Sequence, residues 1–277
     1  MGCEIDMKTN ATESAGAYLL LFYHDEILVK EHDGVIQIPK MADLNQLNIQ
    51  TCELQNLGNL HGIPYYSTTL AAKTTCAGFR FIKLKQLSEH MAEKYFAMAF
   101  RAYHILNWLK SNQYCGCCSG SMQLVQESQE IAVKCQLCGH IVYPRISPAI
   151  IVAVFKENEI LLARSSRFPP GRYSVIAGFV EPGETIEACV CRELSEEVGI
   201  TVDNIQYFGN QPWPFPDSLM IAFTARYVSG EITIDNHEIV EAGWFTADAL
   251  PEIPDRGTIS RQLIDYFITN HSISEKQ

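Results

Sequence analysis

The sequence predicts a protein of the α+β class in three segments, residues 1–110, 111–145 and 146–277. Candidate strands and helices are mixed along the chain without the regular βαβ alternation of a parallel sheet. The chain has 277 residues, which exceeds the usual size of one domain, and five of its ten cysteines fall within residues 111–145. Hydrophobic residues make up 47% and charged residues 19%, a globular composition that excludes general disorder.

The first segment, residues 1–110, is predicted to be a mixed domain. Apolar runs at 17–22 and 27–29 flank a short polar turn, which is typical of a β-hairpin. Over residues 89–109 apolar side chains recur at helical spacing, so a helix with a core or interface face is expected. No residues in this segment have the spacing of metal ligands or of a catalytic nucleophile.

The second segment, residues 111–145, carries two Cys-x-x-Cys pairs, Cys115 with Cys118 and Cys135 with Cys138. Each pair can present two thiolates from one turn, and two such turns complete a tetrahedral site with no open position, which indicates a structural zinc ribbon. Cys117 is interpreted as a spectator, although it could compete for the metal. The remaining cysteines are expected to be small buried residues: Cys3, Cys52, Cys76, Cys189 and Cys191.

The third segment, residues 146–277, begins with a predicted hairpin formed by residues 149–155 and 160–164. A strand is expected at 174–180, followed by a helix over 185–198 that stops at Gly199. Further strands are expected at 219–227 and 231–234, and a closing helix at 257–269.

The charge is unevenly distributed along the chain. The net charge is −11, of which −10 lies in residues 146–277 and −1 in residues 1–145. This balance argues against a protein that holds polyphosphate chains by bulk positive charge. Residues 178–200 contribute six glutamates and one arginine, so half of the acidic excess has a local origin.

The predicted helix over 185–198 places three glutamates together. Glu193, Glu196 and Glu197 stand at positions i, i+3 and i+4, so their carboxylates converge on one face and repel each other. Divalent cations that prefer oxygen ligands, Mg²⁺ or Mn²⁺, would relieve that repulsion. A solvated acidic helix face is the alternative interpretation.

The glutamates are part of a longer pattern. Residues 178–200 match every fixed place of G-x5-E-x7-R-E-U-x-E-E-x-G-U, in which U is a bulky aliphatic residue, so the segment resembles the Nudix box. Residues 211–218 resemble the S-Q-P-W-P-F-P-x-S signature of the NADH pyrophosphatase branch of Nudix hydrolases, with Asn210 in place of the leading serine. The resemblance is sharp from Cys115 to about Arg261, and it implies a Nudix α/β/α sandwich in the third segment.

The resemblance also implies an activity and its cofactors. Members of this branch hydrolyse the pyrophosphate of NADH and NAD to a nicotinamide mononucleotide and AMP, and some bacterial members remove NAD caps from RNA 5′ ends. They are homodimers with a structural zinc ion and catalytic Mg²⁺ or Mn²⁺. The expected partners are therefore NADH or NAD, NAD-capped RNA, and a second copy of the chain.

By the same resemblance, Glu193 and Glu197 ligate the catalytic metals, with Glu196 beside them, and Glu197 polarises the attacking water. The backbone carbonyl of Ala177 is another expected ligand. A carboxylate from outside the box completes the set, either Glu238, which the family spacing favours, or Glu241.

Other residues of the box are expected to be structural. Gly178 belongs to this group, and Glu184 is expected to pair with Arg192 to hold the loop to the helix, with direct catalysis as the alternative.

Aromatic rings are expected to select the substrate by stacking on its bases. For Phe215, core packing is an equal alternative. Three prolines predict that residues 211–218 form a rigid loop and not a regular central strand. The expected substrate contacts are Tyr143, Phe179, Gln211, Pro212, Trp213, Pro214, Phe215, Pro216, Asp217, Ser218, the backbone near Ser260, and Lys85 from the first segment.

Two other functions remain open from the sequence. One is a pyrophosphatase for ADP-ribose or another nucleoside diphosphate derivative, and the other is a catalytically silent zinc-ribbon module that only binds nucleotides. The first residues lack the layout of a secretory signal, and no apolar run approaches the roughly 20 residues of a membrane helix. The sequence therefore predicts a cytoplasmic protein without a membrane partner.

Overall fold

The computed structural model describes residues 16–47, 49, 54–125, 130–234 and 236–271. The predicted α+β class is confirmed. Two compact units are present, one made of residues 1–145 with 214–216 and the other of residues 146–213 with 217–277. The cysteine-rich segment falls in the first unit.

The first unit contains a six-stranded sheet in which the order is β3-β2-β1-β5-β4 and β6 pairs with β2. The β1–β2 hairpin confirms the prediction for residues 17–29, and the β1–β5 pair is parallel. Buried leucines on one side of this sheet, among them Leu19, Leu21 and Leu28, form its core. The strands are β1 (Tyr18–Tyr23), β2 (Glu26–His32), β3 (Val35–Gln37), β4 (Gln55–Leu60), β5 (Ile63–Thr69) and β6 (Phe79–Lys83).

The helical region predicted at 89–109 is divided in the structure. The main helix α4 spans Glu93–Ser111, while residues 89 and 90 end the short helix α3 (Leu87–His90). The prediction of one helix from residue 89 is wrong because Met91 and Ala92 adopt extended backbone angles. The predicted buried stripe of α4 is present in Met98, Ala102 and Ile105. The remaining short helices of this unit are η1 (Met41–Asp43), α2 (Leu44–Leu47) and η2 (Leu84–Gln86).

A small antiparallel sheet follows α4 in the same unit. It consists of β7 (Met122–Leu124), β8 (Val133–Cys135) and β9 (Ile141–Val142), with β8 in the middle. One Cys-x-x-Cys turn, at residues 115–118, precedes β7, and the other, at residues 135–138, begins with the last residue of β8 and leads towards β9.

The second unit is built on a sheet whose order is β13-β14-β10-β11-β15, with β12 paired to β10. The β10–β11 pair confirms the predicted hairpin at 149–164, and β10 runs parallel to β14. The strand expected at 174–180 is shorter than predicted. The strands are β10 (Ser147–Lys156), β11 (Glu159–Ser165), β12 (Ile176–Phe179), β13 (Thr201–Trp213), β14 (Ser218–Ser229) and β15 (Ile239–Thr246).

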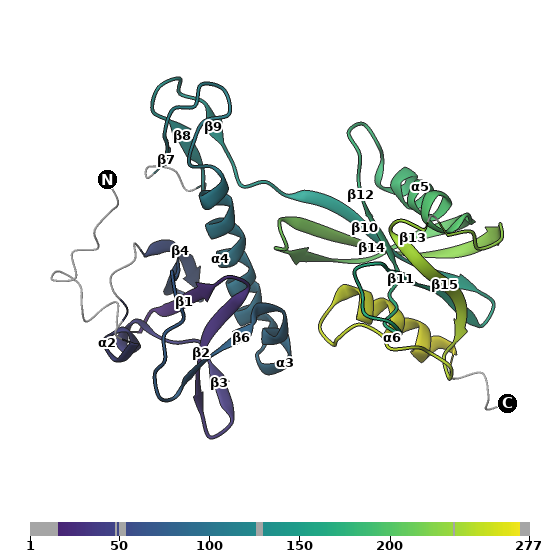
Figure 1. Cartoon of the computed structure of the whole chain (residues 1–277), viewed down its shortest axis with the longest axis horizontal. Helices are drawn as coiled ribbons and strands as arrows, with labels where there is room; N and C mark the ends of the chain where they lie inside the picture. The colour runs from purple at the N-terminus through teal and green to yellow at the C-terminus, as the bar shows by residue number, and fades with distance from the viewer. Residues whose placement is uncertain (1–15, 48, 50–53, 126–129, 235, 272–277) are drawn as a thin grey trace. The chain divides into compact units, whose positions relative to one another are not determined.

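One long helix covers each face of this sheet, which confirms the α/β/α sandwich (Figure 1). Helix α5 (Ile186–Val198) packs on one face through Val190 and Leu194. Helix α6 (Ile259–His271) packs on the other face through Leu263 and Phe267. The predicted ends of α5 are present, because the Thr185 hydroxyl accepts the Ala188 N–H at 3.2 Å and Gly199 adopts a left-handed φ of 72°.

Two predictions for the second unit are wrong. Residues 231–234 do not form a strand, because their alternating apolar side chains pack on the core while the Thr233 N–H donates to Val198 at the end of α5. Residues 211–213 are not part of a loop but end β13, whose edge position tolerates the missing N–H of Pro212. Only residues 214–217 form the turn.

The cysteines outside the zinc-ligand pattern differ in burial. Cys189 is fully buried as predicted, Cys76 is half-buried, and Cys191 is exposed, contrary to the prediction. Cys191 points away from the core because it lies two positions from Cys189 on α5. Cys3 and Cys52 lie outside the described residues. Among the described residues, no helix has the length and apolar character needed to cross a membrane.

Candidate active site and zinc centre

Helix α5 gives its three candidate glutamates different environments. The apolar side of the helix docks on the sheet, and this brings Glu193 and Glu197 to 9% and 7% exposure. The side chain of Glu196 is 61% exposed. The two buried carboxylates stand one helical turn apart, so α5 presents a pair of inward-facing carboxylates and one outer carboxylate.

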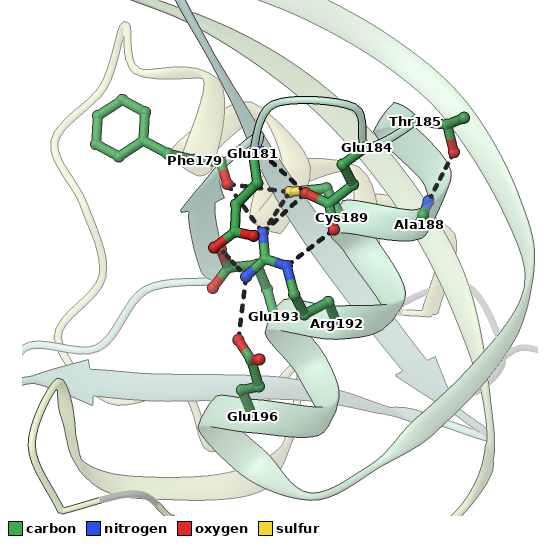
Figure 2. Close-up of polar contacts among 9 residues, drawn as sticks. All are labelled: Phe179, Glu181, Glu184, Thr185, Ala188, Cys189, Arg192, Glu193 and Glu196. Atoms are coloured by element: carbon green, nitrogen blue, oxygen red, sulfur yellow. Dashed lines mark hydrogen bonds and ion pairs between the residues drawn. The ribbon is translucent and has the colours of Figure 1, made fainter.

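Arg192 is the centre of a polar network that joins the loop before α5 to the helix (Figure 2). Its guanidinium donates to both carboxylate oxygens of Glu184 at 2.8 and 2.9 Å, and to the carbonyl of Phe179 at 3.0 Å. The predicted Glu184–Arg192 ion pair is therefore present. Arg192 holds the pKa of Glu184 down at about 2, helped by the Glu181 N–H that donates to the same carboxylate.

The same guanidinium also reaches two of the candidate glutamates. Arg192 donates to Glu193 at 2.9 Å and to Glu196 at 3.0 Å. Burial raises the pKa of Glu193; the hydrogen bond from Arg192 opposes this, and the charges of Glu196 and Glu238 raise the pKa further. One cation thus serves three carboxylates, which leaves negative charge on this side of the helix for other cations.

Gly178 of β12 lies directly against the Glu193 carboxyl group. A Cβ atom at position 178 would overlap that carboxyl group. The absence of a side chain therefore lets the backbone of β12 approach the Glu193 carboxylate. Glycine is needed here for space, because the backbone angles at position 178 are ones that other residues could also adopt.

A cavity of about 440 Å³ opens beside the carboxylates of Glu197 and Glu238. All of the residues that line it belong to the second unit. Ala177, Glu197 and Glu238 are among them. Glu241, the alternative to Glu238, is engaged elsewhere. Its carboxylate accepts from Arg164 at 2.6 Å and from the Tyr173 hydroxyl, and these contacts lower its pKa, Arg164 most strongly.

The donors around this cavity fit a divalent cation that prefers oxygen. Carboxylates of Glu197 and Glu238 and the backbone of Ala177 line the cavity. Glu193 does not line it, but its carboxyl group lies against Gly178, and its pKa, raised mainly by burial, is raised further by the charge of Glu238. Hard oxygen ligands with high negative charge suit Mg²⁺ or Mn²⁺ better than softer metals.

Three of the predicted substrate contacts line the cavity: Gln211, Trp213 and Ser260. Gln211 is 9% exposed, and both ends of its amide are hydrogen-bonded to backbone at the start of α6. The amide donates to the carbonyl of Gly257 at 2.8 Å and accepts the Ile259 N–H at 2.9 Å. Gln211 therefore holds the wall in place while presenting one face to the cavity.

The other predicted contacts do not line this cavity. Phe179 is 56% exposed and its ring points away from the Arg192 network (Figure 2), Ser218 is buried in β14, and Asp217 accepts the Ser147 N–H through its carbonyl. Pro212 pairs with Leu219 in the sheet. Tyr143, Pro214, Phe215, Pro216 and Lys85 belong to the first unit.

Within the first unit, Phe215 is packed among other side chains. Its ring centroid lies 6.0 Å from that of Phe100 and 5.5 Å from that of Tyr103, both on α4. The Nζ atom of Lys85 lies 4.8 Å from the centroid of the same ring. This arrangement favours the packing interpretation of Phe215 over stacking on a substrate base.

Several cavity residues were not predicted from the sequence. They come from the last residue of β11, from the loop after it and from the turns before β15 and α6. No local pattern distinguishes them from ordinary loop residues. A long-range pairing signal would be needed to find them. They include Ser165, Ser166, Arg167, Phe168, His237 and Thr258.

The four predicted zinc ligands are brought together in the first unit. The Sγ atoms of Cys115, Cys118, Cys135 and Cys138 all lie within 4.8 Å of one another. Cys115 and Cys138 are 3.7 Å apart, and Cys118 and Cys135 are 3.4 Å apart. A tetrahedral zinc ion with Zn–S bonds of about 2.3 Å requires sulfurs about 3.8 Å apart, so the cluster is compatible with zinc.

The backbone of each turn favours the thiolate at one cysteine, Cys115 or Cys135. Hydrogen bonds from the N–H groups of Cys138 and Leu137 lower the pKa of Cys135 to about 6. The N–H of Cys117 lowers the pKa of Cys115 in the same way. At Cys118 the backbone hydrogen bond at Gly120 lowers the pKa, but side-chain hydrogen bonds with Cys138 and Cys135 outweigh it and raise the pKa to about 12. The Cys117 thiol is exposed and lies outside the four-sulfur cluster, and Gly139 adopts a positive φ of 76°.

Comparison with protein families finds two matches along this chain. Residues 145–267 match the NUDIX domain, and residues 16–108 match the NADH pyrophosphatase-like rudimentary NUDIX domain. A curated protein of Pseudomonas aeruginosa named NAD-capped RNA hydrolase NudC is 40% identical over 95% of this chain and 92% of its own length. A protein of the same name from Vibrio vulnificus is 40% identical over 84% of this chain and 87% of its own length.

Among solved structures, a NUDIX hydrolase from Nitrosomonas europaea is similar in fold. The TM-score is 0.50 at 23% identity, and the match covers 58% of this chain and 93% of that one. The chain belongs to the Nudix hydrolase family and carries an NADH pyrophosphatase-like domain before its Nudix domain.

Proposed function

We propose that this protein hydrolyses the pyrophosphate bond of NADH and NAD, giving a nicotinamide mononucleotide and AMP, and that it removes NAD caps from RNA by the same reaction. The observation that carries the proposal is the convergence of Glu197, Glu238 and Ala177 on one cavity in the Nudix unit. The likeness to relatives named NAD-capped RNA hydrolase supports the choice of substrate.

The reaction depends on divalent cations, for which we propose Mg²⁺ or Mn²⁺. Glu193, Glu197, Glu238 and the Ala177 carbonyl would hold them. When bound, the ions would neutralise the charge of the two phosphates and make the attacking water more acidic. Glu196 is more exposed than Glu193 and Glu197, and we propose that it adds negative charge beside the metal ligands without being one of them.

The protein's own groups then have defined tasks. Glu197 accepts a proton from the attacking water as the water oxygen forms a bond to one phosphorus. The bond from that phosphorus to the bridging oxygen breaks, and the other phosphate leaves with the bridging oxygen. Arg192 keeps Glu193 oriented and fixes the loop at Glu184. Trp213 and Phe168 offer aromatic surface in the cavity for a base.

Other features of the proposal concern the whole protein. We propose the domain limits 1–110, 111–145 and 146–277, a structural zinc ion held by the four-cysteine cluster, a homodimer, and a cytoplasmic location. We further propose that Tyr143, Phe179 and Lys85 contact substrate. The rings of Tyr143 and Phe179 are exposed, and Tyr143 and Lys85 belong to the first unit.

The activity is tested by incubating the purified protein with NADH and Mn²⁺ and measuring release of AMP. The Glu197→Gln variant should lose at least roughly 100-fold in rate, because general-base removal typically costs 10²–10⁴-fold. Glu187→Gln is the matched control, since Glu187 is exposed in the first turn of α5 and does not line the cavity.

The result also separates the two alternative functions. Preferred turnover of ADP-ribose over NADH, judged by kcat/KM, would assign a different pyrophosphatase. Binding of NADH without cleavage in either metal would make the protein a nucleotide-binding module. Absence of both binding and AMP release contradicts the proposal altogether.

A further inference from the structure

Arg167 is distinctive among the residues that line the cavity. The ionisable side chains of the lining are Arg167, Glu197, His237 and Glu238. Within the described part of the chain, Arg167 is the only lining residue with a permanent positive charge. A cavity proposed to receive a diphosphate therefore contains one fixed cation beside its metal-binding carboxylates.

The guanidinium of Arg167 is not used inside the protein. Arg167 forms no ion pair with any residue that the structure describes, and Arg256, which does not line the cavity, is like it in this respect. The other arginines of the second unit do pair with carboxylates. These are Arg164, Arg172, Arg192, Arg226 and Arg261.

The backbone around Arg167 is held firmly although the side chain is exposed. The Ser166 N–H donates to the carbonyl of Glu238 at 2.9 Å, and the Phe168 N–H donates to Ser165 at 2.9 Å. The loop is closed at its base by two hydrogen bonds between Ala163 and Ser174, at 2.8 and 2.9 Å. Arg167 is thus kept beside Glu238, and little backbone entropy is lost when its side chain binds a ligand.

A guanidinium has the shape and charge to bind phosphate. It can donate two parallel hydrogen bonds to two phosphate oxygens, and such charge-assisted pairs are among the stronger polar contacts. The carboxylates of the cavity repel phosphate and bind it only through cations. Arg167 offers the one permanent positive charge among the lining side chains of the described chain that an anionic substrate could contact.

We propose that Arg167 binds the diphosphate of the substrate directly and is a substrate-binding residue of this site. The inference rests on the proposed function. The residue contributes to substrate binding, not to proton transfer, so its loss should raise KM much more than it lowers kcat. It serves NADH and NAD-capped RNA alike, because both carry the same diphosphate.

The test compares steady-state kinetics of wild type, Arg167→Gln and Arg167→Lys with NADH and with an NAD-capped oligonucleotide. Arg167→Gln should raise KM for both substrates roughly 10- to 100-fold, as expected for loss of one charge-assisted contact. Arg167→Lys should fall between, since it keeps the charge but loses the paired donors. Arg226→Gln is the control. It removes the same positive charge from β14, six residues after Met220, at a position that does not line the cavity.

A second measurement uses the fluorescence of NADH to obtain Kd in the Glu197→Gln background without added divalent ions. Arg167→Gln should weaken this binding about 10-fold. A KM for NADH within threefold of wild type, or an effect confined to the capped oligonucleotide, overturns the proposal for the diphosphate. If wild type releases no AMP from NADH, the proposed function has failed, and the binding measurement still decides the role of Arg167.

Discussion

Gly178 gives a sharp test of how the site is assembled. In Gly178→Ala the new methyl group would occupy the position of the Glu193 carboxyl group. The new Cβ would lie 1.9 Å from the Glu193 carboxyl carbon. Carbon atoms in ordinary contact stand about 3.5–4.0 Å apart, so the carboxyl group would have to move by roughly 1.6–2.1 Å. The movement would also weaken the 2.9 Å hydrogen bond from Arg192 to Glu193.

The expected cost can be worked out from that displacement. A misplacement of about 1 Å at a reacting group can cost 10²-fold in rate, which corresponds to about 2.7 kcal/mol of transition-state stabilisation. Overpacking costs about 1–3 kcal/mol of folding free energy, which is less than the total of about 5–15 kcal/mol for a typical domain. The variant should therefore remain folded while losing most of its activity.

The assay is AMP release from NADH at saturating Mn²⁺, combined with thermal denaturation. Gly209→Ala is the control, because its Cβ would meet Ile259 at an ordinary distance of 3.7 Å. The reasoning is refuted if Gly178→Ala retains activity within threefold of wild type. It is also refuted if activity falls only in proportion to the unfolded fraction, since Glu193 would then not be the cause.

Other predictions concern the zinc centre, the pH dependence and the core. Cys135→Ser, or a strong chelator, should remove about one zinc per chain and lower the melting temperature, measured by metal analysis and calorimetry; an unchanged zinc content would contradict the site. Because the folded pKa of Glu184 is lowered to about 2, its stabilising contribution is complete above an unfolded pKa of 4.5 and disappears as the pH falls towards 2. The melting-temperature gap between wild type and Glu184→Gln should close over that range, and a constant gap would exclude the ion pair as its source. Phe267→Ala should cost about 3–5 kcal/mol in denaturant unfolding, because Phe267 is fully buried on α6, whereas a cost below about 1 kcal/mol would contradict its packing.

The elements that the sequence predicts best are those whose signals are local. Helix α5 has Thr185 at its start, Gly199 at its end and an apolar stripe between them, so its limits follow from capping and periodicity. The four zinc ligands are recognised in the same way, since each pair lies within one turn. The repelling glutamates on one face of α5 are also a local signal, and the cation site that they indicate stays a prediction.

Features that depend on distant partners were not predictable. Strand β13 was missed along most of its length because register shifts interrupt its alternation, and its partner β14 supplies the regularity that the sequence lacks. Residues 231–234 have the alternating pattern of a strand, but the Thr233 N–H donates to Val198 at the end of α5 and not to a neighbouring strand. The convergence of Arg167, His237 and Thr258 on the cavity likewise arises from three separate turns.

The two hydrogen bonds of Gln211 have a mechanical consequence. They fasten the end of β13 to Gly257 and to Ile259, the first residue of α6, a helix on the face of the sheet opposite to the glutamate helix. Any fraying of α6 would therefore release one wall of the cavity, even though its buried side chains lie on the far side of the sheet. Loosening of this last helix should register as lost substrate affinity before the sheet itself comes apart.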